Sequence, residues 1–292
     1  MIAMSTNNQG GNARVSSMSQ VRTVTKYAFL NYFRARRFYV MLGIVLLVSG
    51  LLTFAAAYYR PPAFGFGSST SSNPALTFYS AFWGGFATIV VILSVAFFGG
   101  DAISGEFQNK TGYFLIPNPL RRSVVYVGKW LAALGASTLI LAVFALIALA
   151  NGTYFFGVSV PYQFAESLVF AWVYLVSAMG LTFLFSSLFK SSSISILMTV
   201  ILLLFAFDVI DTIASAVAGI EPWFSITYAG GIIANILAVP FPLHSVTTQF
   251  GKRFTLTTFN ASVPEALVIM AVYFVISAAL GLWLFERKEF TS

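Results

Sequence analysis

Six long apolar runs constrain this chain more than any other feature of its sequence. They cover residues 38–59, 77–99, 124–150, 164–189, 194–217 and 264–285. A helix of about 20 residues crosses the hydrocarbon core of a bilayer, so each run is long enough to span it. The sequence therefore predicts an all-α integral membrane protein with about six transmembrane helices. The third run is overlong, and we expect its first residues to belong to the preceding loop.

Composition agrees with a bilayer as the solvent of this chain. Only 9% of the residues are charged, 58% are hydrophobic, and the mean hydropathy is +0.85. A water-soluble domain needs more ionisable side chains on its surface, whereas a charge near the bilayer centre costs about 3 kcal/mol. The net charge of +7 does not indicate a nucleic-acid partner, because the basic residues are strung between the apolar runs. The positions of the basic residues are better explained by membrane topology. We expect membrane lipids to surround the chain.

The positions of lysine and arginine predict the orientation of the chain. These residues are enriched in cytoplasmic loops. If both termini are cytoplasmic, all but three of the 16 basic residues lie on cytoplasmic segments, and only Arg60, Lys252 and Arg253 lie outside. We therefore expect a multi-pass protein of the cell membrane with its N- and C-termini in the cytoplasm.

The segment before the first apolar run divides into two parts. Residues 1–20 are small and polar, which predicts a disordered cytoplasmic tail, and residues 21–292 are expected to form a single transmembrane domain. Within that domain, residues 21–37 mix apolar residues with five basic residues at loosely helical spacing. This pattern predicts an interfacial helix that lies on the membrane surface.

A further apolar stretch at residues 226–243 leaves two topologies to compare. If it crossed the membrane, the chain would have seven spans and the C-terminus would lie outside. The stretch contains Gly230, Gly231, Pro240 and Pro242, which suit short broken helices that enter the membrane where protein surrounds them. Together with the charge rule, this favours six spans and short re-entrant helices before the last one.

Motifs of catalysis are missing from the sequence. Gly128-Lys129 lacks the upstream glycine of a Walker phosphate-binding loop, so ATP hydrolysis by this chain alone is not expected. The chain has no cysteine and one histidine, His244, which excludes disulfides and Cys/His nucleophilic sites. We expect no catalytic site, no metal site and no cofactor in this chain, and we predict that His244 is a solvated residue in an outer loop.

Two acidic residues lie inside the fifth apolar run. Asp208 and Asp211 are three residues apart, so a helix places them on one face. They have two possible roles. In one, they face water near the outer membrane interface. In the other, they form a polar part of a translocation path, because acidic residues inside a membrane usually have a function.

The loop between the second and third runs combines charges with an apolar patch. Asp101 and Glu106 come first, and a basic pair, Arg121 and Arg122, ends the loop. The patch between them consists of Tyr113, Phe114, Leu115 and Ile116. An apolar patch beside charges in a cytoplasmic loop indicates contact with a protein partner or with the membrane surface.

This loop resembles the signature of the type-2 family of ABC-transporter export permeases. In that family an acidic residue, a Gly-Thr pair, a leucine-rich stretch, a proline, a basic residue and a Gly-Lys pair recur in this order before the third span. The matching positions are Asp101, Ser104, Gly105 and Glu106, then Tyr113 to Ile116, Pro119, Arg121 or Arg122, and Gly128-Lys129. The Gly-Thr pair is reversed here, as Thr111-Gly112, so the local turn is expected to differ. The basic interfacial helix, the six spans and the broken helices also agree with the family.

The resemblance implies that the chain is the membrane subunit of an ABC exporter. Two such subunits, identical or paralogous, would enclose a path, and two separate ATPase subunits with bound ATP and Mg would drive it. They would press on a cytoplasmic coupling helix within residues 101–122. The coupling residues implied are Asp101, Glu106, Tyr113, Phe114, Leu115, Ile116, Arg121 and Arg122.

Two other classes of function are compared with this one. An intramembrane enzyme or assembly factor should show clustered ionisable side chains at matching depth, and the only such cluster in the sequence is the pair Asp208 and Asp211. An ATP-independent channel or carrier is the other alternative, and carriers usually contain inverted repeats, of which this sequence gives no convincing sign. The exporter subunit is therefore the leading prediction.

Overall fold

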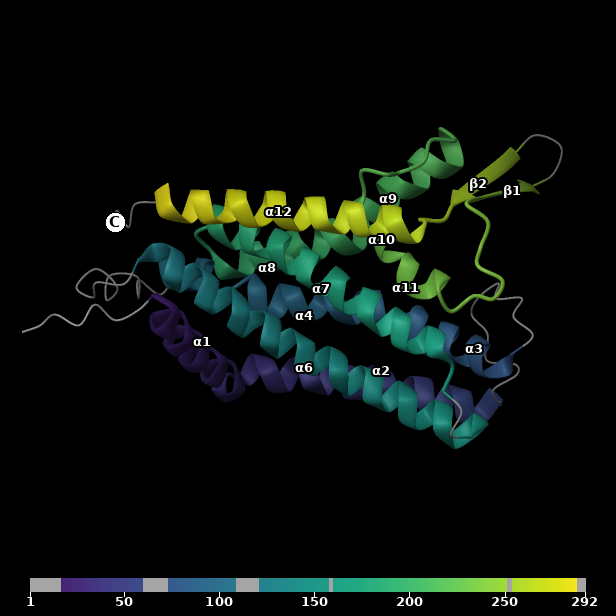
Figure 1. Ribbon diagram of the computed structural model, residues 1–292, viewed down its shortest axis with the longest axis horizontal. Helices are drawn as coiled ribbons and strands as arrows, with labels where there is room; N and C mark the ends of the chain where they lie inside the picture. Colours follow the sequence, from purple (N-terminus) through teal and green to yellow (C-terminus); the bar gives the residue numbers. More distant parts are fainter. Residues whose placement is uncertain (1–16, 60–72, 109–120, 158–159, 251–253, 288–292) are drawn as a thin grey trace, which may run out of the picture.

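The computed structural model describes residues 17–59, 73–108, 121–157, 160–250 and 254–287. These residues form a bundle of long helices that run roughly parallel to its longest axis (Figure 1). Within the described part, six helical segments are long and apolar enough to cross a membrane. The all-α integral membrane fold predicted from the sequence is thereby confirmed.

The six spans are built from straight helices and from stacked helical pieces. Besides α6 (Arg122–Phe156), three spans are single helices, α2 (Arg36–Tyr59), α7 (Tyr162–Leu188) and α12 (Val263–Arg287). The second span joins α3 (Pro74–Tyr79), the π-helical turn η2 (Ser80–Gly84) and α4 (Ala87–Gly99), and α5 (Ser104–Gln108) follows after a turn. The fifth span stacks α8 (Ser192–Ile201), η4 (Leu202–Ala206), α9 (Phe207–Thr212) and η5 (Ile213–Val217).

The remaining span, α6, differs from the prediction. It runs unbroken from Arg122 to Phe156, a length of 35 residues, so its first residues are helical and do not belong to the loop. The reason is that helix α1 packs against this part of α6 at two glycines. A Cβ atom on Gly128 would lie 2.7 Å from Cγ1 of Val24, and one on Gly135 would lie 3.0 Å from the ring of Phe29. The absence of these side chains lets the two helices approach closely and buries the start of α6.

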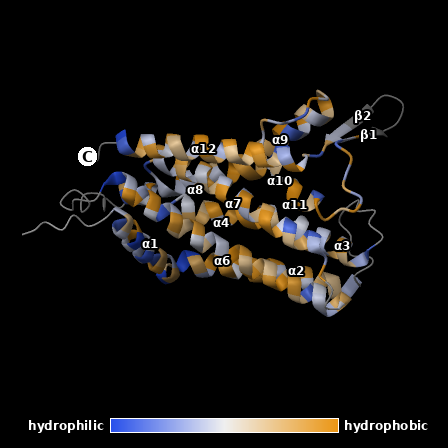
Figure 2. Ribbon diagram, in the orientation of Figure 1, coloured by the Kyte–Doolittle hydropathy of each residue, from blue (hydrophilic) through white to orange (hydrophobic). Residues whose placement is uncertain are grey.

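Helix α1 (Ser17–Arg34) forms where the sequence predicts an interfacial helix, with two differences in its bounds. It begins at Ser17, inside the stretch predicted as a tail, and it ends at Arg34. A bend at Ala35 separates it from α2, so Arg36 and Arg37 begin the first span. Helix α1 is inclined to the bundle axis and is more hydrophilic than the spans (Figures 1 and 2).

The stretch at residues 226–243 forms two short helices and no seventh span. Helix α10 (Ile226–Gly230) and helix α11 (Ile232–Asn235) are followed by turns. Ser167 of α7 donates a 2.5 Å hydrogen bond from its hydroxyl to the carbonyl of Ile233, and it accepts one from the indole Nε1 of Trp83 at 2.9 Å. These bonds attach α11 to the aromatic core of the bundle. The prediction of short broken helices is confirmed.

A β-hairpin before the last span was not predicted. Strand β1 (Ser245–Phe250) pairs antiparallel with β2 (Phe254–Phe259), with Ser245 opposite Phe259. The local signal was present, because both segments are rich in threonine and other β-favouring residues. From the sequence, Lys252 and Arg253 were expected outside the membrane, and no strands were assigned to this segment.

The bundle has two distinct ends. The first, called the α1 end, holds α1, α5, the start of α6 and the end of α12. There the guanidinium of Arg122 donates a 2.8 Å hydrogen bond to the carbonyl of Glu286. The other, called the hairpin end, holds α3, the β-hairpin and the start of α12 (Figure 1).

Candidate functional site

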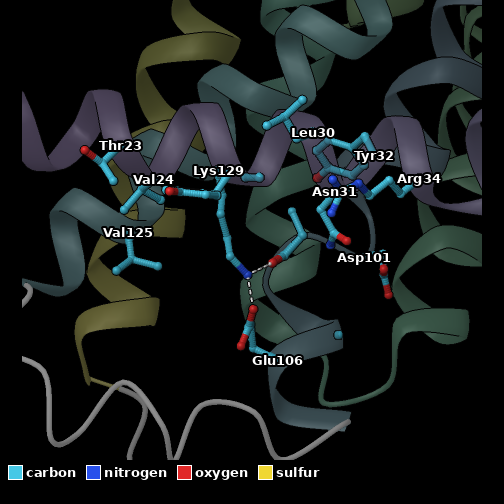
Figure 3. A pocket seen from close by; sticks show the side chains of 14 residues that line it. Thr23, Val24, Leu30, Asn31, Tyr32, Arg34, Asp101, Glu106, Val125 and Lys129 are labelled. Atoms are coloured by element: carbon cyan, nitrogen blue, oxygen red, sulfur yellow. Dashed lines mark hydrogen bonds and ion pairs between the residues drawn. The ribbon is translucent and has the colours of Figure 1, made fainter.

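An open pocket of about 790 Å³ lies at the α1 end, between α1, the α4–α5 turn and α6. Polar side chains from all three elements line it, among them Arg34, Asp101, Glu106 and Lys129. Figure 3 shows Lys129 and Glu106 reaching toward each other in this pocket. The carboxylates that the sequence analysis singled out therefore lie where the loop between the second and third spans begins.

Lys129 connects α6 to helix α5. Its ammonium forms an ion pair with the carboxylate of Glu106 and donates a 2.8 Å hydrogen bond to the carbonyl of Ala102. The side chains of Lys129 and Glu106 are only 16% and 24% exposed. Because the contact is largely shielded from water, it constrains α5 more strongly than a surface ion pair would.

Asp101 connects the same turn to two other helices. Its carboxylate pairs with Arg37 of α2 and accepts a hydrogen bond from the hydroxyl of Ser192 at the start of α8. Gly105 makes room for it, since a Cβ atom there would lie 2.8 Å from Oδ1 of Asp101. Any larger residue at position 105 would displace the carboxylate or the helix.

Backbone groups of the turn are also held by neighbouring helices. The hydroxyl of Ser186 on α7 accepts hydrogen bonds from the amides of Ile103 and Ser104, at 2.9 and 3.0 Å. Gln108 at the end of α5 accepts a 2.8 Å hydrogen bond from the amide of Ser192. The hydroxyl of Tyr32 on α1 donates to the carbonyl of Phe98 at 2.8 Å. Burial and the nearby Asp101 raise the pKa of Tyr32 above its ordinary value, so its hydroxyl keeps the proton that it donates.

The acidic residues of the fifth span lie in a second pocket, toward the hairpin end. Asp208 and Asp211 both line this cavity of about 390 Å³, together with Tyr228 and Asn235. Their placement agrees with the prediction that they share one helix face. Oδ2 of Asp211 accepts hydrogen bonds from the hydroxyls of Ser225 and Thr227, each at 2.7 Å.

Two π-helical turns, η4 and η5, flank these acidic residues and were not predicted. Such turns widen the helix locally and often occur near functional sites. They have no reliable sequence signature, because the extra residue in the turn is accommodated by packing. The two roles considered for Asp208 and Asp211, facing water at the membrane interface or lining a translocation path, both stay predictions.

Residues 22–290 match the family model described as ABC-2 family transporter protein. The chain belongs to the ABC-2 transporter family. The match covers nearly the whole chain and confirms the resemblance found in its sequence. A comparison with curated proteins gave no match.

Family and fold together define the class of this molecule. With its six apolar helices, it is a multi-pass transmembrane permease of an ABC transporter, and members of the ABC-2 family are membrane components without a catalytic site of their own. Association with an ATP-binding subunit is a general property of this family.

The predicted coupling residues of this ABC-2 permease fall into two groups. Tyr113, Phe114, Leu115 and Ile116 lie outside the described residues. The others, Asp101, Glu106, Arg121 and Arg122, are at the α1 end, where Arg121 directly precedes α6. Residues 101–122 contain one short helix in their described part, α5.

Sequence reasoning missed the partners of these carboxylates within the same chain. Arg37, Lys129 and Ser192 bind Asp101 or Glu106. Lys129 had a signal, because the Gly-Lys pair before the third span is part of the family signature. Arg37 was expected among the cytoplasmic bases opposite Glu106, but it pairs with Asp101 instead. No pattern connects Ser192 with Asp101, which lies 91 positions earlier.

A third polar cluster of the ABC-2 permease lies at the hairpin end. Glu221 accepts a 2.7 Å hydrogen bond at Oε1 from the hydroxyl of Tyr228, and its Oε2 lies 3.2 Å from Nε2 of His244. Glu265, in the first turn of α12, accepts a 3.2 Å hydrogen bond from the amide of Ser262. The side chain of His244 is 54% exposed, in keeping with a solvated residue. Its contact with Glu221 did not follow from the sequence.

Hydrogen bonding controls the charge of Glu221. Burial raises the pKa of this carboxyl, but hydrogen bonds with Tyr228, Glu265 and His244 outweigh burial and bring the pKa below its ordinary value. Glu221 is therefore a negatively charged acceptor at neutral pH.

Proposed function

We propose that this ABC-2 permease is the membrane subunit of an exporter driven by ATP hydrolysis on a separate ATPase subunit. Two permease subunits, identical or paralogous, would enclose the path, and ATP and Mg would bind only to the ATPase subunits. Residues 21–292 would act as one transmembrane domain in the cell membrane, with both termini and the α1 end in the cytoplasm.

The observation that carries this proposal is the set of contacts around α5. Glu106 pairs with Lys129 of α6, and Asp101 contacts Arg37 of α2 and Ser192 of α8. Ser186 binds the amides of the same turn from α7. A displacement of α5 would therefore be passed to four membrane helices at once, as a coupling element requires.

The distribution of charge supports the proposed orientation. The α1 end carries basic residues of α1, of the start of α2 and of the start of α6, which are Arg22, Lys26, Arg34, Arg36, Arg37, Arg121, Arg122 and Lys129. The hairpin end has the acidic residues Glu221 and Glu265. Basic residues are retained on the cytoplasmic side of a membrane, so the α1 end is the end expected to meet a cytoplasmic ATPase.

The internal contacts suggest separate roles for the coupling residues. Asp101 and Glu106 would position α5, because both carboxylates already bind within the chain. The aromatic and aliphatic patch from Tyr113 to Ile116 would make the apolar contact with the ATPase, with Arg121 and Arg122 beside it. An exposed patch of this kind in a cytoplasmic loop is otherwise a liability for solubility.

Co-purification tests this proposal. The tagged permease is isolated from its native host, and a protein with a Walker motif and ATP hydrolysis activity is expected to accompany it. Substituting Phe114→Asp together with Leu115→Asp should release that protein, since burying unpaired charge in an interface costs several kcal/mol, on the order of 2–5. The variant permease should still be found in the membrane fraction.

A matched control comes from the other end of the molecule. Tyr154→Asp introduces one aspartate at a side chain that is 83% exposed near the C-terminal end of α6, and it should leave the ATPase bound. Retention of the ATPase by the Phe114→Asp/Leu115→Asp variant, or its absence from the unaltered permease, would contradict the proposal.

A further inference from the structure

Three possible metal ligands meet at the hairpin end from three separate parts of the chain. Glu221 lies in the segment after η5, His244 directly precedes β1, and Glu265 is in the first turn of α12. One ligand atom of each lies within 4.8 Å of the others. The closest pair, Oε2 of Glu221 and Nε2 of His244, is 3.2 Å apart. Tetrahedral ligands at about 2 Å from one ion are about 3.3 Å apart, so the Glu221–His244 pair fits one ion, and the carboxylate of Glu265 would close in on binding.

The two carboxylates of this cluster need a positive charge between them or a shared proton. A carboxylate oxygen of Glu221 lies within 4.8 Å of one of Glu265, and two ionised carboxylates at such a distance repel. Within the described part of the chain, the only basic side chain in contact with either carboxylate is the imidazole of His244, 3.2 Å from Glu221. A divalent cation would neutralise both carboxylates and bind the imidazole as well.

Hydrogen bonds outside the cluster orient each ligand. The hydroxyl of Tyr228 holds Oε1 of Glu221 and leaves Oε2 directed at His244. The amide of Ser262 holds Oε2 of Glu265. The amide of Asn260 donates a 2.8 Å hydrogen bond to the carbonyl of His244, which fixes the backbone that carries the imidazole. Contacts of this kind are typical of metal sites, because they set the direction of ligands before the metal binds.

We propose that Glu221, His244 and Glu265 form a binding site for a divalent transition-metal cation, with Zn²⁺ as the best match. One imidazole and two carboxylates are a ligand set that Zn²⁺ accepts, and a water molecule would complete the tetrahedron on the exposed side of His244. Mg²⁺ and Ca²⁺ prefer sites made of oxygen ligands alone, so the imidazole argues against them. The expectation of no metal site in this chain is replaced by this proposal.

The bound ion would link three elements at the outer end of the permease. It would tie the segment after the fifth span and the residues before the hairpin to the start of the sixth span, α12. Its role would be structural, because the ion would hold together elements that are otherwise joined by a few hydrogen bonds. This inference is independent of the proposed ATPase coupling, since none of the three ligands lies at the α1 end.

Metal binding can be measured directly on the purified chain. The protein would carry a tag without histidine, be stripped with EDTA in detergent, and be titrated with Zn²⁺ against a chromophoric chelator. One Zn²⁺ per chain is expected, with a higher midpoint of thermal unfolding, whereas Mg²⁺ should compete poorly. The chain has no cysteine and no second histidine, so few other sites can bind Zn²⁺ with nitrogen or sulfur ligands.

Variants separate this site from nonspecific binding. His244→Gln and Glu265→Gln should each weaken Zn²⁺ binding by more than about 100-fold, since loss of an outer hydrogen-bond partner alone costs about 10–100-fold. Tyr228→Phe removes such a partner, so its loss of Zn²⁺ affinity should be about 10–100-fold. Glu166→Gln, which changes an exposed carboxylate in the first turns of α7, is the matched control and should bind as the unaltered chain does.

A ligand exchange provides a spectroscopic test that does not depend on loss of function. His244→Cys should keep one metal per chain, and Co²⁺ bound to it should show the charge-transfer absorption of a Co²⁺–thiolate bond. Absence of a one-to-one Zn²⁺ complex in the unaltered chain would overturn the proposal. It would also be overturned by equal affinity of the His244→Gln variant, or by a His244→Cys variant without the thiolate band.

Discussion

Lys129 pairs with Glu106 across the two ends of the segment that joins the second and third spans. Glu106 is on α5, just before residues 109–120, and Lys129 is on α6, about two turns after its start at Arg122. The ion pair therefore closes this loop at its base, and the additional bond from Lys129 to the carbonyl of Ala102 strengthens the closure.

Removal of one partner of this pair should destabilise the permease. Lys129→Met removes the Lys129 ammonium from a largely shielded carboxylate, and the free energy of unfolding should fall by about 1–3 kcal/mol. The double variant Lys129→Met/Glu106→Gln should lose less than the sum of the two single changes, because the residues interact directly. Unfolding of the purified variants in detergent measures both quantities, and additive effects would contradict the contact.

Gly105 should not tolerate even a methyl group. In Gly105→Ala the new Cβ would lie 2.8 Å from Oδ1 of Asp101, so the carboxylate would have to leave Arg37 or Ser192. We expect a loss of stability of about 1–3 kcal/mol, as for other overpacked sites.

Gly43 provides the control for this substitution. It lies within α2, and a Cβ atom there would meet nothing within 4 Å. Gly43→Ala should therefore be neutral or should stabilise the helix by up to about 1 kcal/mol. Thermal unfolding of the two variants side by side would test the prediction, and equal effects would contradict it.

The acidic pair of the fifth span should not be needed for folding. Asp208→Asn together with Asp211→Asn removes two charges from a membrane helix, which lowers the free energy cost of insertion. The amide oxygen at position 211 can still accept a hydrogen bond from Ser225 or Thr227. The double variant should reach the membrane at the usual level and elute as a single peak, and aggregation would contradict this. Unchanged export would then favour an interfacial role, and lost export a role in the translocation path.

The orientation of the molecule can be tested with single cysteines, since the natural chain has none. An impermeant thiol reagent should label Tyr154→Cys in intact cells and Lys190→Cys only after permeabilisation. Gly152 is a poor choice for the outer position, because a Cβ atom there would lie 2.1 Å from the hydroxyl oxygen of Tyr79. Labelling of Lys190→Cys from outside would contradict cytoplasmic placement of the α1 end.

Hydropathy alone predicted the spans of this protein because lipid imposes a local requirement on sequence. Each helix must be apolar over about 20 residues, and this can be read without knowing its neighbours. The run at residues 38–59, for example, is α2 from Arg36 to Tyr59. The broken structure of residues 226–243 could be predicted for a similar reason, since glycine and proline act on the backbone where they stand.

The contacts within the polar sites of this protein could not be predicted from the sequence, because they depend on tertiary structure. Asp101 and Ser192 lie 91 positions apart, and Glu221, His244 and Glu265 come from three segments. Which side chains meet depends on how each helix is rotated and shifted along its axis. Close packing fixes these variables, as where Val24 of α1 fits against Gly128 of α6. The sequence by itself therefore determined which segments enter the membrane, whereas only packing between helices decided which polar groups face one another.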